Sequence, residues 1–325
     1  MTEPFPKTAH GFVLARDARA LGRQAELASA VRSGQLEVVR RGVYMAPIVA
    51  PAEREIAKGR AANYRRQVLA ASEVLRSPVF TSYSAIALHG LPIIGHWPKQ
   101  VFVLAPDTHG YRRSTTVGIA RLDEVPLTKV GDLVVTSLEH SLIQLCRHAA
   151  LGPALVAVEA ALAAMPWSDA PPLTTIERLR VEHARLRPYP HARKVEAVLT
   201  RASSLSATPI ETCSKLCFEE FGFPPPVQQH AIWLPEQRLN AHLDFYWPDF
   251  DAAGEADGDV KYLGQAVPDD AVRVVVEEKK REEAVRRRVR ALDRWDWTEM
   301  WRRHPLVRRL VGLGLPCGTR RLRLF

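Results

Sequence analysis

The chain has 325 residues, of which 46% are hydrophobic and 25% charged, a composition that excludes a disordered or fibrous protein and fits a globular one. Its formal net charge of +9 favours an anionic partner, and nucleic acid is the commonest such partner. No stretch reaches the roughly 18 apolar residues of a membrane span, residues 1–10 lack a signal-peptide pattern, and the four cysteines lack zinc-ribbon spacing. We therefore expect a cytoplasmic protein that does not bind membranes.

The first segment, residues 11–46, has the pattern of two short helices followed by a β-hairpin. Apolar residues at helical spacing predict helices over residues 13–21 and 25–31. Strand-like runs predict the two arms of the hairpin over residues 36–39 and 42–45. These are the parts of a winged helix-turn-helix, in which the second helix enters the major groove of DNA and the wing contacts phosphates.

The polar side chains of this segment indicate how it would meet DNA. We expect Gln24, Ser29 and Arg32 to face the DNA from the second helix. Arg40 and Arg41 would contact phosphates from the wing. The alternative is a small structural domain whose arginines are merely solvated. The order of the elements favours double-stranded DNA as the partner.

The middle of the chain predicts a linking helix and then a compact α+β unit. Residues 51–75 form a charged, alanine-rich helical pattern, after which short strands and helices follow to residue 165. His89 precedes Gly-Leu-Pro after an apolar run, a setting more typical of a packed histidine at a helix end than of a catalytic one. The predicted domains are a winged helix-turn-helix with its linker helix over residues 1–75, an α+β domain over 76–203, and an α/β domain over 204–325.

The last domain carries acidic residues on separate predicted elements. Glu211 follows Thr208 by three residues in a capping-box pattern, which explains this glutamate without a metal ion. Asp244 lies in an alternating strand over residues 239–247, on the face opposite the apolar residues. An exposed strand aspartate is the alternative, although aspartate is disfavoured in strands.

Two further acidic residues and a lysine follow this strand. Glu255 and Asp257 share one face if they lie in a strand. Lys261 joins that face only if the strand continues through Asp257-Gly258, which is itself a turn signal, so the spacing leaves its position open.

Carboxylates from separate elements suit a hard divalent cation such as Mg²⁺, which takes oxygen ligands. A bound Mg²⁺ activates water and stabilises charge on a phosphate that is being cut. The pattern therefore indicates a metal-dependent nuclease with Asp244 and Glu255 as metal ligands. Asp257 and Glu211 would assist, and Lys261 would position the attacking water or the phosphate.

The C-terminal part continues with a predicted strand over residues 272–276 and a helix over residues 277–292. Glu282–Arg286 and Glu283–Arg287 are spaced as favourable helical ion pairs. Arg286 and Arg287 either form a solvated helix face or hold DNA phosphates beside a nuclease site. A further short strand is predicted to begin at Arg294.

Several motifs resemble those of a known protein family. Those of the first 92 residues are Gly11-Phe12, Gly34-Gln35-Leu36, Arg41-Gly42-Val43-Tyr44 and Leu88-His89-Gly90-Leu91-Pro92. They are similar to actinobacterial proteins with an AbiEi-type antitoxin domain. Those of the last third are Phe221-Gly222-Phe223-Pro224, Leu243-Asp244-Phe245, Glu255-Ala256-Asp257-Gly258 and Arg294-Trp295. They resemble endonucleases of the very-short-patch-repair type, within the PD-(D/E)XK fold.

The resemblance implies that Glu211, Asp244, Glu255 and Asp257 match the acidic positions of the family. The PD-(D/E)XK pattern expects a lysine two residues after the second acid, and Asp257 occupies that position. Two functions follow from the resemblance: a Mg²⁺-dependent DNA endonuclease, or a non-enzymatic regulator of the AbiEi type with a degenerate nuclease domain. A regulator would bind an operator and could have a cognate toxin as its partner.

Overall fold

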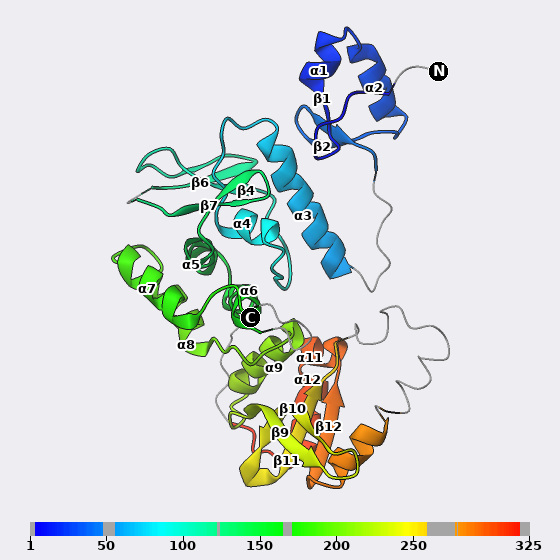
Figure 1. Ribbon diagram of the computed structural model, residues 1–325, viewed down its shortest axis with the longest axis vertical. Coiled ribbons are helices and arrows are strands. Elements are labelled where there is room, and N and C mark those ends of the chain that lie inside the picture. The colour runs from blue at the N-terminus through cyan, green and yellow to red at the C-terminus, as the bar shows by residue number, and fades with distance from the viewer. Residues whose placement is uncertain are drawn as a thin grey trace. The chain divides into compact units, whose positions relative to one another are not determined.

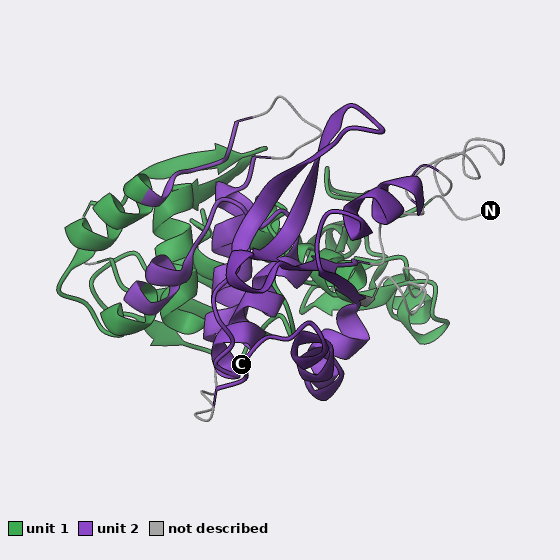
Figure 2. Ribbon diagram, turned by 90° about the horizontal axis from the view of Figure 1, so that it is seen from below, with its two compact units in different colours: residues 1–149, 177–195 green, residues 150–176, 196–325 purple. Residues whose placement is uncertain are grey.

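The computed structural model of the chain describes residues 4–47, 56–121, 124–164, 171–258, 277 and 279–318 (Figure 1). Within these residues helices and strands are mixed, which confirms the α+β class. The chain forms two compact units, one of residues 1–149 and 177–195 and the other of residues 150–176 and 196–325 (Figure 2). The three domains defined from the sequence stay a prediction.

Unit 1 begins with two helices and a small sheet. Its elements are β1 (Val13–Leu14), α1 (Ala15–Ala20), α2 (Gln24–Arg32), β2 (Glu37–Arg40) and β3 (Val43–Met45). The central strand β3 pairs antiparallel with both neighbours. Gly22 and Gly34 end the two helices with φ values of 69° and 74°, which glycine adopts without strain. The first helix starts two residues later than predicted because Val13 and Leu14 pair with β3.

The helix α3 (Ile56–Ser72) packs in two directions within unit 1. Its side chains Tyr64 and Val68 enter an apolar core that also holds Phe80 and Val103. Ala70 instead packs against residues of the N-terminal sheet such as Phe12 and Val43. The helix predicted as a linker therefore shares two cores.

The remainder of unit 1 is a mixture of short strands and helices. The elements are α4 (Ser82–Leu88), β4 (Val101–Leu104), β5 (Tyr111–Arg112), β6 (Thr116–Ile119), β7 (Leu127–Val130), β8 (Leu133–Thr136), α5 (Leu138–His148) and α7 (Ile176–Leu186). Their strands form one sheet in the order β4-β6-β5 and a two-stranded ladder of β7 and β8. His89 directly follows α4 and is half-buried.

Unit 2 is built around a four-stranded sheet with helices. The elements are α6 (Leu151–Leu162), α9 (Pro209–Glu220), β9 (Val227–Leu234), β10 (Leu239–Trp247), η2 (Pro248–Phe250), β11 (Ala252–Ala256), β12 (Ala291–Trp295), α11 (Trp297–Arg302) and α12 (His304–Gly312). A further helix, α8 (Ala192–Arg201), crosses from unit 1 into unit 2. The sheet has the order β12-β11-β10-β9, in which β12 runs parallel to β11 and the other pairs are antiparallel.

Aromatic residues fix α9 to this sheet. The ring of Phe218 on α9 meets the rings of Phe245, Trp247 and Trp295 edge-on, with centroids 5.0, 5.4 and 5.8 Å apart. Gly254 lies beneath Trp295, and a Cβ atom at this glycine would come within 2.4 Å of the indole ring. The close packing therefore requires glycine at this point of β11.

In the last third, the structure agrees with the strand predicted over residues 239–247. It differs around β12, which begins at Ala291, inside the predicted helix, rather than at Arg294. The strand β10 has the predicted bounds, and its apolar residues Leu243, Phe245 and Trp247 are buried as the alternation required. The helix predicted to reach residue 292 is helical over 279–286, because residues 291–295 pair with β11 instead. The strand predicted over 272–276 lies outside the described residues. No helix in the described part of the chain is long and apolar enough to cross a membrane.

Candidate functional site

The helix α2 presents one continuous exposed face. Leu27 is buried in the core of the N-terminal group, which fixes the rotation of the helix. The exposed residues spaced along the opposite side are Gln24, Ala25, Ala28, Ser29 and Arg32. Glu26 is also exposed, but its carboxylate accepts hydrogen bonds from Arg23 at 2.8 and 3.0 Å. The face consequently combines small side chains, two polar groups and one arginine, which allows close approach of a ligand.

The two arginines of the hairpin have different surroundings. Arg41 is exposed in the turn between β2 and β3. Arg40 is half-buried and donates hydrogen bonds to the hydroxyl groups of Thr115 and Thr116 at 2.9 and 2.8 Å. Arg41 is therefore the arginine of this pair that faces solvent, and Arg40 attaches the hairpin to the β5–β6 segment.

In unit 2, the candidate carboxylates lie where β10 and β11 separate. The two strands pair from Trp247↔Ala252 to Phe245↔Gly254. Asp244 follows the last of these pairs, and its Oδ2 accepts a hydrogen bond from the backbone N–H of Ala256 at 2.9 Å. The aspartate thus satisfies a backbone N–H of β11 beyond the last residue pair with β10, which accounts for an acidic residue inside a strand.

Glu211 on α9 lies beside Asp244. The side-chain amide of Gln229 donates to Glu211 Oε2 at 3.2 Å and to Asp244 Oδ1 at 3.3 Å. Burial, and then the negative charge of Asp244, raise the pKa of Glu211 to about 7. Glu211 therefore changes its protonation state near neutral pH.

The predicted capping box at Glu211 is only partly present. The Thr208 hydroxyl donates to Glu211 Oε1 at 2.6 Å, and the N–H of Ala207, rather than of Thr208, donates to Oε2 at 3.0 Å. The Thr208 side chain accepts no hydrogen bond from the helix backbone. Glu211 organises the start of α9 and the carboxylate pair together.

Gln229 was not identified from the sequence as a site residue. Its backbone has a φ of 50°, a conformation that is strained for a residue with a side chain. Its neighbour Gln228 accepts a hydrogen bond from Lys215 and donates one to Ser206 at 2.9 Å. The only signal in the sequence was that Gln228 and Gln229 are consecutive polar residues in a strand. In a regular strand one of the two side chains would face the apolar side of the sheet, which makes such a pair unusual.

A buried ion pair supports the same helix. Glu159 on α6 is fully buried, and its Oε1 lies 2.5 Å from the Nζ atom of Lys215 on α9. The hydroxyl of Thr212 and the N–H of Ser203 also donate to this carboxylate, at 2.7 and 2.9 Å. The buried charge is therefore compensated by a cation and two hydrogen bonds.

Glu255 and Asp257 meet arginines. The carboxylate of Glu255 forms ion pairs with Arg294 at 2.5 Å and Arg281 at 3.3 Å. Asp257 Oδ2 lies 3.8 Å from the same Arg294 guanidinium. The structure thus connects Glu255 and Asp257 through Arg294, and it connects Glu211 and Asp244 through Gln229.

The donor set expected for Mg²⁺ is not assembled among the described residues. No three or more Asp, Glu, His or Cys side chains of this part of the chain surround one point as a metal site requires. The oxygens of Glu255 face guanidinium groups rather than a common centre with Asp244. Lys261 lies outside the described residues. Mg²⁺ at Asp244 and Glu255 stays a prediction, and no catalytic step is derived through it.

The two arginines proposed to hold phosphates, Arg286 and Arg287, each pair with a glutamate of the helix over residues 279–286. Arg286 pairs with Glu282 at 2.9 Å and also donates to the backbone oxygen of Leu292. Arg287 lies 3.9 Å from Glu283, and both side chains are exposed. The two ion pairs predicted from helical spacing are confirmed, and surface pairs of this kind contribute little stability.

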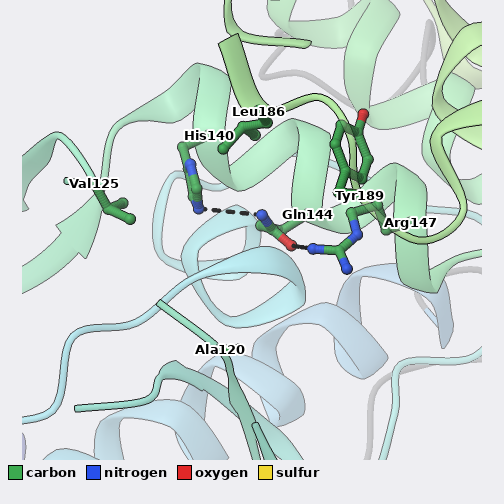
Figure 3. Close-up of a pocket in the computed structure, with 7 residues that line it drawn as sticks. All are labelled: Ala120, Val125, His140, Gln144, Arg147, Leu186 and Tyr189. Atoms are coloured by element: carbon green, nitrogen blue, oxygen red, sulfur yellow. Dashed lines mark hydrogen bonds between the residues drawn. The ribbon is translucent and has the colours of Figure 1, made fainter. Parts of the chain in front are cut away.

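A separate small cavity occurs in unit 1 beside α5 (Figure 3). Gln144 connects the His140 ring at 3.2 Å to the Arg147 guanidinium at 2.7 Å, and Glu182 bonds the other ring nitrogen of His140 at 2.8 Å. The cavity volume of about 20 Å³ is sufficient for about one water molecule and too small for a substrate. This polar network is consistent with a structural role.

Comparison with known proteins gives a match for the N-terminal segment that contains α2 and the β2–β3 hairpin. The model of a family described as "Transcriptional regulator, AbiEi antitoxin" matches residues 8–47. The matched segment spans α1, α2 and the β-hairpin, so the match supports a DNA-binding regulatory role for the chain. A search of curated proteins finds no match. The resemblance of the last third to endonucleases stays a prediction.

Proposed function

We propose that this protein is a transcriptional regulator of the AbiEi antitoxin type that binds an operator through its N-terminal winged helix-turn-helix. The observation that carries the proposal is the exposed face of α2 within the segment that matches the regulator family. In such a domain α2 is the recognition helix, and the β2–β3 hairpin is the wing. A cognate toxin is the protein partner that the family description suggests.

Each polar residue has a distinct role in this proposal. Gln24 and Ser29 contact base edges, and the small residues between them let the helix enter the major groove. Arg32 and Arg41 contact phosphates or guanine. Between residues 8 and 47 six arginines stand against three acidic residues, which favours attraction to the DNA backbone. Arg40 positions the wing through Thr115 and Thr116.

The test is binding to a DNA site that the purified protein selects from a random-sequence pool. Arg32→Ala and Arg41→Ala should each weaken binding by about 1–3 kcal/mol or reduce the salt slope by about one unit. Arg308→Ala, an exposed arginine of α12 that has no proposed contact with DNA, is the matched control and should change neither quantity. Unchanged affinity and salt dependence in both N-terminal variants would refute the proposed interface.

A second candidate function, phosphodiester hydrolysis at Asp244, is favoured by one observation. Glu211 lies beside Asp244 with a pKa of about 7, and a carboxyl group with such a pKa can act as a general acid or base at neutral pH. Asp257 in the lysine position argues for the regulator. Incubation with supercoiled plasmid in Mg²⁺, Mn²⁺ or EDTA tests this candidate. Metal-dependent nicking that Asp244→Ala removes would support the nuclease, and intact plasmid with either metal would reject it.

A further inference from the structure

We propose that the guanidinium of Arg294 is the resident cation of an acidic group formed by Glu255, Asp257 and Glu282, in place of a divalent metal ion. The inference is independent of DNA binding by α2. It concerns the disagreement between the metal site that the sequence pattern indicates and the contacts that the acidic residues make.

The first support is the number of carboxylates around one guanidinium. Arg294 Nη2 lies 2.5 Å from Glu255 Oε2. The other terminal nitrogen, Nη1, lies 3.8 Å from Asp257 Oδ2 and 3.9 Å from Glu282 Oε2. Among the residues that the structure describes, three acidic ones from β11, its C-terminal end and the helix over 279–286 therefore surround one positive charge.

The second support is that backbone pairing fixes this arrangement. The strands β11 and β12 run parallel with Glu255 directly beside Arg294 in register. Neighbouring residues in register project to the same face of a sheet, so the two side chains are adjacent before either selects a rotamer. The Arg281 guanidinium lies 3.3 Å from the remaining Glu255 oxygen. Both oxygens of Glu255 are thus engaged by arginines.

The third support is burial. The Glu255 side chain is 7% exposed and that of Arg294 is 19% exposed. A buried carboxylate requires a compensating cation, and the planar guanidinium supplies several donors at once. A metal ion at Glu255 would have to lose water and also displace Arg294, leaving a buried guanidinium without its closest carboxylate. Wild-type protein therefore excludes divalent metal from this position.

The proposal is tested by Mn²⁺ binding to the full chain, measured by electron paramagnetic resonance of free Mn²⁺ and by calorimetry. Four proteins form a cycle: wild type, Glu255→Gln, Arg294→Ala and the double variant. Glu255→Gln should leave the Mn²⁺ binding of wild type unchanged. Arg294→Ala should bind Mn²⁺ at least tenfold more tightly than wild type, through a site that wild type lacks, and the double variant should lose this gain.

Two results would overturn the proposal. One is Mn²⁺ binding by wild type that Glu255→Gln removes, because Glu255 would then be a metal ligand despite Arg294. The other is a folded Arg294→Ala variant without additional Mn²⁺ binding. If circular dichroism finds Arg294→Ala unfolded, Arg294→Gln takes its place, because it keeps much of the side-chain length and loses the charge, with the same expected result. Arg281→Ala is the matched control and should gain no site, because Arg294 remains in place.

Discussion

The exposed face of α2 and the carboxylate region of unit 2 hold their polar groups in opposite ways. On α2, Gln24, Ser29 and Arg32 lie on the surface. In unit 2, Glu211 is buried beside Asp244, and Glu255 is buried between two arginines. The polar side chains of α2 are therefore accessible to a binding partner, whereas the carboxylates of unit 2 are hydrogen-bonded or ion-paired within the protein.

This difference indicates which substitutions should affect binding and which should affect stability. A surface helix can lose a polar side chain without loss of packing, so its substitutions should affect binding alone. A buried network of charges loses compensation when one member is removed, so its substitutions should affect stability first. The following predictions test the separation, from the largest expected effect to the smallest.

Lys215→Ala should lower the free energy of unfolding of unit 2 by about 3–5 kcal/mol, because it leaves the carboxylate of Glu159 buried without its cation. Denaturant unfolding followed by tryptophan fluorescence measures the change. Arg287→Ala removes a partner from an exposed ion pair and should cost less than about 0.5 kcal/mol. A loss below about 1 kcal/mol in Lys215→Ala would contradict the importance of the buried pair.

Gly254→Ala should destabilise unit 2 by about 1–3 kcal/mol, because its Cβ would overlap the Trp295 ring at 2.4 and 2.6 Å. Thermal unfolding measures this loss. Gly312→Ala, in α12 with no atom within 4 Å of the added Cβ, is the control and should be neutral or stabilising. Equal effects of the two substitutions would mean that the indole ring moves aside at little cost.

Glu211→Gln should change how stability depends on pH. The folded protein binds the Glu211 proton more tightly than the unfolded chain, since the pKa rises from 4.5 to about 7. The stabilisation by this group is therefore complete below pH 4.5 and is lost as the pH rises through about 7. Between pH 4.5 and pH 8 wild type should lose about 3 kcal/mol relative to Glu211→Gln. Denaturant unfolding at several pH values measures the difference, and parallel profiles of the two proteins would refute the raised pKa.

Arg32→Ala should have the smallest effect on folding, within about 0.5 kcal/mol, because its side chain is exposed on α2. The same variant should still weaken DNA binding as proposed above. Thermal unfolding and anisotropy measurements on one protein preparation compare the two quantities. A substantial loss of stability would show that Arg32 supports the fold and would remove the contrast between the two regions.

Much of the local structure could be predicted from the sequence, because short-range patterns control it. The alternation over residues 239–247 gave the bounds of β10, and helical spacing gave the pairs Glu282–Arg286 and Glu283–Arg287. The prediction of a helix to residue 292 was wrong over residues 287–292, because the helix ends at residue 286 and residues 291–295 pair with β11 as a strand. The local helical pattern carries no information about β11, and pairing with this distant strand overrides the local helical preference.

The candidate sites divide in the same way. Helical spacing was sufficient to predict which polar residues of α2 are exposed, because one helix carries them and its buried residue Leu27 sets which face is exposed. Their contact with DNA stays a prediction. Tertiary structure alone decided that Gln229 joins Glu211 to Asp244 and that Arg294 meets Glu255. These residues are far apart along the chain, and the sheet register and the packing of α9 bring them together. The charge that a buried carboxylate faces depends on such contacts, so the acidic pattern identified the residues but not their partners.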